Sequence, residues 1–353
     1  MTPSPFAQPA ALAASSAAPA VPTLSVIPFT SPTAAELATS PATVALLYFD
    51  DEAASAQRLA QAWNSIYALA TGITLQPQLV QRHRFPDGEF KLRLPTPLPP
   101  RVVLWRNLHQ PNEKLVEMLL AACTARTLGA QHLTLVTPYL GYMRQDIAFA
   151  PGEAVSQRIV GTFLAGLFDA LITVDPHLHR VATLVEAVPV AQPLVVSGAP
   201  VLADWIHQQR PGALLIGPDE EAEQWVAQAA ARHGNASGVC RKVRHGDHDV
   251  SIALPAGLDV QGRAVVVLDD VISTGHTVAQ AARLLLAAGA ASVDVAVTHA
   301  LLAPGAPALL QAVGVAHLWS TDCIPHASSM VPMAAPLAHA LAQLLAANAA
   351  IPP

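Results

Sequence analysis

Basic residues are scarce in this chain of 353 residues. Lys and Arg together number 19 against 25 Asp and Glu, so the formal net charge is −6. Proteins that bind nucleic-acid backbones use clustered Lys and Arg, and the composition therefore predicts no nucleic-acid partner. Long apolar runs are also missing, since none approaches the ~20 uncharged residues of a membrane span. With 52% hydrophobic residues, the chain is expected to be globular, without membrane association, and long enough for two domains.

Cysteine is rare as well. Cys123, Cys240 and Cys323 are isolated from one another and odd in number, which gives neither a disulfide framework nor the spacing of metal ligands. Residues 1–40 are rich in Ala, Pro, Ser and Thr, and no Lys or Arg precedes Arg58. This composition predicts a disordered tail over 1–40. Because the basic start of a signal peptide is absent, we expect a cytoplasmic protein.

Apolar β-prone runs alternate with amphipathic helical segments along the rest of the chain. Such alternation predicts parallel sheets flanked by helices. A Pro-rich passage near residues 190–200 separates two such series, so the expected domains are 41–190 and 191–353. The expected strands are 44–49, 101–105, 133–136, 170–175, 213–219, 264–268 and 293–298, and the expected helices include 53–70, 114–127, 156–168 and 278–288.

The stretch 264–277 carries the strongest functional signal. An apolar strand over 264–268 is followed by Asp269 and Asp270, then by a polar turn over 273–277 that leads into a helix. Free N–H groups and the dipole at a helix N-terminus favour a phosphate. Adjacent carboxylates suit sugar hydroxyls or a divalent cation. Simple helix capping is the alternative, but one cap needs only one such residue. The pattern therefore predicts a ribose phosphate ligand.

Other polar segments are ambiguous when taken alone. The Pro-Asp-Gly sequence within 84–94 is typical of an exposed β-hairpin turn. Arg144 and Asp146, in the segment 138–146, could form a surface ion pair worth about 0–1 kcal/mol. A histidine pair after a strand, such as His177 and His179, is more often structural than a metal site. The basic cluster 240–247 could be a solvated face.

Together, however, these segments resemble the ribose-phosphate diphosphokinases, also called PRPP synthetases, in the family's order from about residue 44 to 346. Residues 269–277, Asp-Asp-Val-Ile-Ser-Thr-Gly-His-Thr, look like the phosphoribosyl-diphosphate (PRPP) motif that these enzymes share with type I phosphoribosyltransferases. Residues 138–146, Pro-Tyr-Leu-Gly-Tyr-Met-Arg-Gln-Asp, followed by Pro151-Gly-Glu153, resemble the family's ATP site. Residues 85–89, Phe-Pro-Asp-Gly-Glu, resemble its adenine-binding loop.

The resemblance implies two similar phosphoribosyltransferase-like domains of α/β class, each a mainly parallel sheet flanked by helices. It implies the reaction ATP + D-ribose 5-phosphate → AMP + PRPP, with Mg²⁺ as cofactor. ATP would be held by Phe85, Asp87, Glu89, Arg144, Gln145 and Asp146; ribose 5-phosphate by Asp269, Asp270, Ser273, Thr274, Gly275, His276 and Thr277; Mg²⁺ would lie near His177 and Asp219; Lys242 and Arg244 would stabilise the transition state. The family match assigns no role to His179.

The resemblance also implies a homo-oligomer, because the family's Phe85-type loop often serves a neighbouring subunit. Two alternatives remain open. One is a phosphoribosyltransferase that consumes PRPP, which has no need of the ATP segments around Phe85 and Arg144. The other is a non-catalytic regulatory homologue, suggested by departures from the family pattern at Pro176 and at Glu220-Glu221. The retained Lys242 and Arg244 argue against it.

Overall fold

The computed structural model describes residues 42–178, 180–244, 250–255 and 257–349. Side chains are not described for 242–252 and 346–349. The expected disordered tail over 1–40 therefore lies outside the described residues, as do His179 and the end of the basic cluster, residues 245–247. Within the described ranges, no helix combines the length and apolar character needed to cross a membrane.

The first half of the chain, from β1 to β8, forms a six-stranded sheet in which every neighbouring pair is parallel. Its order is β2-β1-β5-β6-β7-β8. The strands are β1 (Ala42–Tyr48), β2 (Ile73–Leu79), β5 (Arg101–Trp105), β6 (His132–Val136), β7 (Ala170–Val174) and β8 (Gln192–Val196). The apolar runs of the four inner strands β1, β5, β6 and β7 are buried on both faces, as parallel strands between helical layers require, whereas the edge strands β2 and β8 are only partly buried.

The second half, from β9 to β16, repeats this arrangement with the order β10-β9-β13-β14-β15-β16, again all parallel. Each half also inserts an antiparallel hairpin at the same place, after its second strand and before its third: β3–β4 in the first and β11–β12 in the second. The expectation of two similar, mainly parallel α/β halves is thus confirmed. The strands are β3 (Gln81–Arg84), β4 (Phe90–Arg93), β9 (Leu214–Gly217), β10 (Ser237–Val239), β11 (Arg241–Arg244), β12 (Val250–Ala253), β13 (Ala264–Ile272), β14 (Ser292–Ala300), β15 (Val315–Thr321) and β16 (Ser329–Val331).

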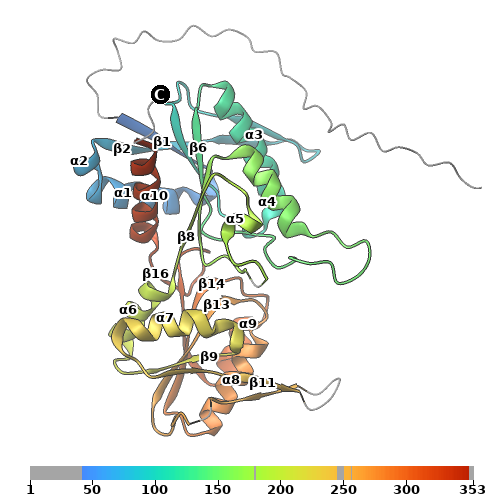
Figure 1. Cartoon of the computed structure of the whole chain (residues 1–353), viewed down its shortest axis with the longest axis vertical. Coiled ribbons are helices and arrows are strands. Elements are labelled where there is room, and N and C mark those ends of the chain that lie inside the picture. The colour runs from blue at the N-terminus through green and yellow to red at the C-terminus, as the bar shows by residue number, and fades with distance from the viewer. Residues whose placement is uncertain (1–41, 179, 245–249, 256, 350–353) are drawn as a thin grey trace, which may run out of the picture. The chain divides into compact units, whose positions relative to one another are not determined.

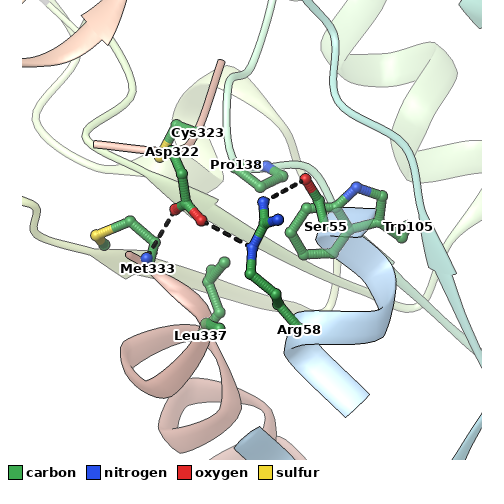
Figure 2. Close-up of a pocket in the computed structure, with 9 residues that line it drawn as sticks. Ser55, Arg58, Trp105, Pro138, Asp322, Cys323, Met333 and Leu337 are labelled. Carbon is green, nitrogen blue, oxygen red and sulfur yellow. Dashed lines mark hydrogen bonds and ion pairs between the residues drawn. The ribbon is translucent and has the colours of Figure 1, made fainter. Parts of the chain in front are cut away.

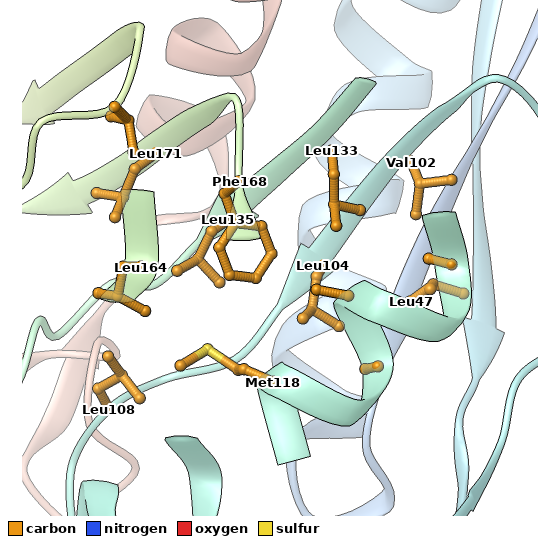
Figure 3. Close-up of a cluster of buried hydrophobic side chains, with 14 of the residues drawn as sticks. Leu47, Val102, Leu104, Leu108, Met118, Leu133, Leu135, Leu164, Phe168 and Leu171 are labelled. Atoms are coloured by element: carbon orange, nitrogen blue, oxygen red, sulfur yellow. The ribbon is translucent and has the colours of Figure 1, made fainter. Parts of the chain in front are cut away.

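Helices cover both faces of each sheet (Figure 1). They are α1 (Ala53–Ile66), α2 (Ala68–Thr71), α3 (Pro111–Thr127), α4 (Ser156–Leu167), α5 (Leu184–Ala187), α6 (Ala199–Gln209), α7 (Glu223–His233), α8 (His276–Ala287), α9 (Ala306–Ala312) and α10 (Ala334–Ala349), with 3₁₀ turns η1 (Asp50–Glu52) and η2 (Glu220–Ala222). In one core of the first half, Leu104 and Leu135 of the sheet pack with Met118 of α3 and Leu164 of α4 (Figure 3). Complete burial of these side chains removes a large apolar area from water and holds the sheet to its helices.

The expected domain boundary at residue 190 does not follow the sheets. Strand β8 begins at Gln192 and is the edge strand of the first sheet. At the other end of the chain, α10 returns to the first half, where Leu337 and Leu341 are buried in one core with Trp63 of α1. Helix α10, red in Figure 1, lies beside α1. Its apolar face is therefore completed by the half that precedes it in sequence.

An ion pair anchors this return. Arg58 of α1 donates from Nε to Asp322 Oδ2 at 3.1 Å, and the Met333 backbone N–H donates to Asp322 Oδ1 at 2.7 Å (Figure 2). Asp322 follows β15, and Met333 directly precedes α10. The Asp322 side chain thus holds the link between the last strands of the second half and the helix that covers the first.

Candidate active site

Polar segments from the two halves meet at the carboxyl ends of β6, β7 and β13. In open α/β sheets, ligands bind at this edge. Asp175 and His177 follow β7, Tyr139 and the 144–153 loop follow β6, and Asp270 lies near the end of β13. Tyr142 and Asp175 have φ of 66° and 34°. Backbone in this left-handed region is costly for non-glycine residues and is concentrated at functional sites.

A direct hydrogen bond joins the two halves at this place. His177 Nδ1 lies 2.8 Å from Asp270 Oδ2, and the Asp270 side chain is almost fully buried. Burial acts to raise the pKa of Asp270, but the hydrogen bond and charge of His177 hold it below its ordinary value. The structure therefore brings together a residue expected at Mg²⁺–ATP and one expected at ribose 5-phosphate.

Asp269 and Asp270 lie within β13, not after it as expected. The strand continues to Ile272 because its backbone stays paired with β14, with Asp269 opposite Val297 and Val271 opposite His299. Burial, followed by the charges of Asp270 and Asp219, raises the pKa of Asp269 well above its ordinary value. The neighbouring carboxylates thus have opposite pKa shifts, and negative charge is concentrated on Asp270.

The polar turn 273–277 leads into α8 as expected. Gly275 precedes the first helical residue, His276, and has φ of 77°, a conformation that glycine adopts without steric cost. The Ser273 carbonyl accepts from Ala303 N at 3.0 Å, which fixes the start of the turn. The first N–H groups of an α-helix have no partner within the helix and can therefore bind an anion.

Asp175 supports the joint between the halves. Its Oδ2 accepts from the Gly198 backbone N–H at 2.9 Å and from Thr298 Oγ1 at 2.8 Å. Burial raises the pKa of Asp175 to about 6. A Cβ on Gly198 would lie 2.7 Å from Thr298 Oγ1, so only glycine fits at this position. The approach of β7 to β14 thus depends on a glycine that the sequence reasoning did not single out.

The 144–153 loop is ordered by its own side chains. Glu153 Oε2 accepts from Phe149 N at 2.7 Å and from Gln145 Nε2 at 3.4 Å, while Gln145 Nε2 also donates to Ile147 O at 3.0 Å. Asp146 is paired with Arg180 at 2.8 Å. Arg144 is exposed. Of the three residues expected at ATP in this loop, Arg144 alone is exposed to solvent, Gln145 is half-buried and Asp146 is buried.

The remaining ATP residues are on the first hairpin, β3–β4. Phe85, Asp87 and Glu89 are all exposed on its turn, which is closed by hydrogen bonds from Phe85 N to Glu89 O and from Glu89 N to Asp87 Oδ1. Beside the hairpin, a groove of about 440 Å³ runs along α3 and is lined by Glu89, Phe90, Glu113 and Val116 among others. Within the described ranges, no hydrogen bond or ion pair joins this hairpin to Arg144 or Gln145.

The second hairpin, β11–β12, carries Lys242 and Arg244 in β11. Their side chains lie outside the described residues, and their expected role stays a prediction. Asp219 caps η2, accepting from Glu221 N at 3.1 Å, and its charge acts on Asp269. Topologically, this hairpin corresponds to the one that carries Phe85.

The carboxylates of this site are suited to a divalent cation. The charges of Asp219 and Asp270 both act on Asp269, and a cation bound near these carboxylates would offset that repulsion. Among the described residues, no three His, Cys, Asp or Glu side chains form a metal cage. Mg²⁺ usually takes one or two carboxylates together with substrate phosphates and water, so the residues present fit that ion.

The corresponding edge of the first half is closed by ion pairs. Asp51 and Glu52 follow β1, and Arg106 follows β5; Arg106 is 1% exposed and bonds both Asp51 and Glu117. Lys114 binds Glu52 at 3.2 Å. In the first half these opposite charges neutralise one another, whereas the second half carries Asp219 and Asp269 at the equivalent strand ends.

Three polar residues at the site had no expected role. Asn107 Oδ1 accepts from Tyr139 N at 2.8 Å, and the Tyr139 ring packs edge-on against His299 at 5.0 Å. His299 Nε2 donates to Val174 O at 2.8 Å, and burial lowers the pKa of His299 to about 4. Each of the three lies within three residues of the end of a predicted strand, which is the signal that could have identified them.

Comparison with known proteins agrees with this geometry. Residues 54–167 match the N-terminal domain of ribose phosphate pyrophosphokinase, and residues 191–312 match the phosphoribosyl transferase domain. The ribose-phosphate pyrophosphokinase of Methanopyrus kandleri is 38% identical over 269 residues, covering 75% of this chain and 90% of that protein. The enzyme of that name from Halobacterium salinarum is 34% identical over 290 residues, covering 81% and 98%.

Among solved structures, the phosphoribosylpyrophosphate synthetase of Mycobacterium smegmatis has the same fold. It superposes with a TM-score of 0.70 at 21% identity and covers 86% of this chain and 99% of its own. From these matches over both halves, the chain belongs to the ribose-phosphate pyrophosphokinase family.

Proposed function

We propose that this protein is a ribose-phosphate diphosphokinase, which converts ATP and D-ribose 5-phosphate into AMP and PRPP. The hydrogen bond between His177 and Asp270 carries the proposal. It brings the expected nucleotide edge of the first half to the expected sugar-phosphate edge of the second, so that both substrates would meet at one place. Relatives that match nearly their whole length bear the same name.

In the proposed reaction, the C1 hydroxyl oxygen of ribose 5-phosphate attacks the β-phosphorus of ATP. The bond between that phosphorus and the oxygen that bridges to the α-phosphorus breaks in line, AMP leaves with this oxygen, and the hydroxyl proton passes to solvent. Such transfers depend on positioning and charge stabilisation rather than on a covalent intermediate. Mg²⁺, when bound, would neutralise phosphate charge.

The residues would divide this task between them. The turn over 273–277 would bind the 5-phosphate at the α8 N-terminus, and Asp270 would accept from sugar hydroxyls. Arg144 is exposed and would bind phosphate oxygens of ATP, for which a guanidinium is a matched donor. Lys242 and Arg244 would bind the transferring group. His177 and Asp219 would lie near Mg²⁺.

The alternatives are less well supported. A phosphoribosyltransferase has no use for the first half, and residues 54–167 match a domain named for the pyrophosphokinases. A regulatory homologue is disfavoured by the intact polar site, in which Asp270, His177 and the 273–277 turn are all ordered.

We further propose a homo-oligomer, because Phe85, Asp87 and Glu89 are exposed on a hairpin that could reach a neighbouring subunit. A cytoplasmic location is proposed as well, because the three cysteines are isolated and form no disulfide framework.

The decisive experiment incubates the purified chain with Mg²⁺, ATP and ribose 5-phosphate and measures AMP and PRPP. Equal amounts of both products, dependent on each substrate, are expected. Arg144→Ala should lose most of this activity. Arg283→Ala, which removes an exposed arginine midway along α8, should keep it. AMP without PRPP, or formation of a nucleotide from PRPP and a free base instead, would contradict the proposal.

A further inference from the structure

We propose that Arg180 is a positioning residue that holds the 144–153 loop in its nucleotide-binding shape by acting through Asp146. The inference rests on the proposed function, because that function gives the loop its ligand. Arg180 lies in the segment after β7, whereas the loop follows β6. The two strands are neighbours in the sheet, so their following segments leave the same edge side by side.

The ion pair between Arg180 and Asp146 is asymmetric in its surroundings. Arg180 Nη1 lies 2.8 Å from Asp146 Oδ1. The Asp146 side chain is 1% exposed, whereas that of Arg180 is 51% exposed. Asp146 Oδ2 is buried with no hydrogen-bond partner among the described residues. Among the described residues, Arg180 is the cation paired with this carboxylate, and a buried carboxylate without such a partner is strongly unfavourable.

Arg180 touches the loop at a second point. Its guanidinium carbon lies 5.7 Å from the centre of the Phe149 ring, which is within cation–π range. Phe149 is 67% exposed, so little else packs on this ring. One guanidinium therefore contacts the loop at two residues, Asp146 and Phe149. The hydrogen bonds that Glu153 accepts from Gln145 and Phe149 link the two ends of the same loop.

This arrangement changes the role expected for Asp146. One of its oxygens is bonded to Arg180 and the other is buried, so neither is directed to solvent for a nucleotide. We therefore assign Asp146 the task of anchoring the loop. Its neighbour Arg144 remains exposed as the group that contacts phosphate. A loop that is ordered before binding loses less conformational entropy when the ligand arrives, and affinity rises accordingly.

The test compares Arg180→Ala with Arg180→Lys and with a matched control. The control, Arg126→Ala, removes an ion pair in which Arg126 lies 2.7 Å from Asp169. Asp169 directly precedes β7, so this pair lies at the amino ends of the strands of the same sheet, opposite the ends that carry the 144–153 loop. For Arg180→Ala we expect ATP affinity, measured by calorimetry, to fall roughly 10- to 100-fold, the range seen when a group that orients a ligand residue is lost. The Michaelis constant for ribose 5-phosphate should not change.

The lysine variant should recover part of the loss, since it keeps the charge but not the planar fork that pairs with a carboxylate and stacks on a ring. Hydrogen exchange of residues 144–153 should accelerate in Arg180→Ala and not in Arg126→Ala. Asp146→Asn should weaken ATP binding as well, and combining it with Arg180→Ala should add little, because both changes break one link.

Wild-type ATP binding with a lower melting temperature in Arg180→Ala would overturn the inference and leave a purely structural ion pair. So would loop exchange that stays at the wild-type rate. The outcome is separate from that of the proposed function: if wild-type protein makes no PRPP but Arg180→Ala still loosens the loop and weakens ATP binding, the positioning role stands and the synthetase assignment falls.

Discussion

At the scale of single residues, the environment of each carboxylate decides its charge. Asp175, Asp269 and Asp270 lie near one another, yet burial raises the pKa of the first two while His177 lowers that of the third. Aspartate at each of these positions therefore has a different task. Asp175 supports the joint between the halves, and Asp270 presents negative charge to the site.

Asp175→Asn should change the pH dependence of stability. The folded pKa of about 6 lies above the ordinary 3.8, so folding favours the protonated form, and stability from this group is lost as pH rises from about 4 through 6. Two pKa units correspond to roughly 3 kcal/mol. Relative to wild type, the variant should gain about 2–3 kcal/mol between pH 4 and pH 7. Urea unfolding at a series of pH values measures this gain, and a pH-independent difference would contradict it.

Asp270→Asn should impair ribose 5-phosphate use more than ATP use. The amide keeps the size of the side chain but removes the charge that favours sugar hydroxyls, and losing a charged hydrogen bond costs about 1.5–3 kcal/mol. We expect kcat/KM for ribose 5-phosphate to fall on the order of 10- to 100-fold. ATP use should fall less, through loss of the His177 partner. Asp259→Asn, at an exposed loop residue, is the control; unchanged kinetics in Asp270→Asn would refute the assignment.

At the scale of elements, the two hairpins are the informative comparison. Each is inserted between the second and third strands of its half, and each carries residues expected at the nucleotide: Phe85 in the first, Lys242 and Arg244 in the second. The first hairpin is tied to the body of its half along its length, because Arg82 pairs with the buried Glu117 of α3 and Arg84 pairs with Glu113. Leu92 of β4 also packs against the core.

Lys242→Ala should lower turnover without weakening substrate binding. A cation that contacts the transferring phosphoryl group only in the transition state contributes to rate alone, typically ~2.7–4 kcal/mol or about 10²–10³ in rate. Calorimetry with a non-hydrolysable ATP analogue, beside steady-state turnover, separates the two quantities. If affinity falls in proportion to rate, Lys242 is a ground-state ligand; if neither changes, the lysine has no part in the reaction.

Gly161→Ala should destabilise the first half. An added Cβ would overlap the Ala187 carbonyl oxygen of α5, so α4 and α5 would have to move apart. Overpacking of this kind costs about 1–3 kcal/mol or more. Gly166 lies on the same helix, and a Cβ added there would meet nothing within 4 Å, so Gly166→Ala should stabilise by roughly 0.5–1 kcal/mol. Thermal unfolding of the pair tests whether close helix approach, rather than helix propensity, requires glycine at 161.

At the scale of the whole molecule, the two halves do not separate cleanly along the chain. Helix α10 completes a core of the first half, and Asp322 holds its approach to α1. The joint at Asp175, Thr298 and His299 connects the sheets at the active edge. The ends of the described chain thus lie in one core, and the site lies where the two sheets are joined.

Leu341→Ala should therefore destabilise the first half although the residue lies at the C-terminal end. Leu341 is fully buried with Trp63 of α1, and truncating such a leucine costs about 2–5 kcal/mol. Leu69→Ala, at a fully exposed leucine of α2, should stay within about 0.5 kcal/mol of wild type. Hydrogen exchange of α1 should accelerate in Leu341→Ala; if only α10 itself is affected, the helix is not part of that core.

The sequence by itself did not predict β2, β8 or α6, but it determined many of the other strands and helices, the two similar halves and the family. Those features depend on local patterns: apolar runs bounded by turns, and motifs whose residues are adjacent in the chain, such as 138–146 and 269–277. Strand β13 ran further than its apolar run because pairing with β14 continues past Leu268. Strand β8, which follows the predicted boundary at 190, pairs in the first sheet for a similar reason, since strand pairing is decided by neighbours in space.

Only the tertiary structure decided which side chains meet. The pairs His177–Asp270, Arg180–Asp146 and Arg58–Asp322 are separated by 93, 34 and 264 residues, and no pattern in the chain couples them. Their energies come from burial and from charges brought together by the packing of distant elements, as do the pKa shifts of Asp175 and Asp269. Local spacing specifies which groups are available at a strand end, whereas the fold determines what each of them faces.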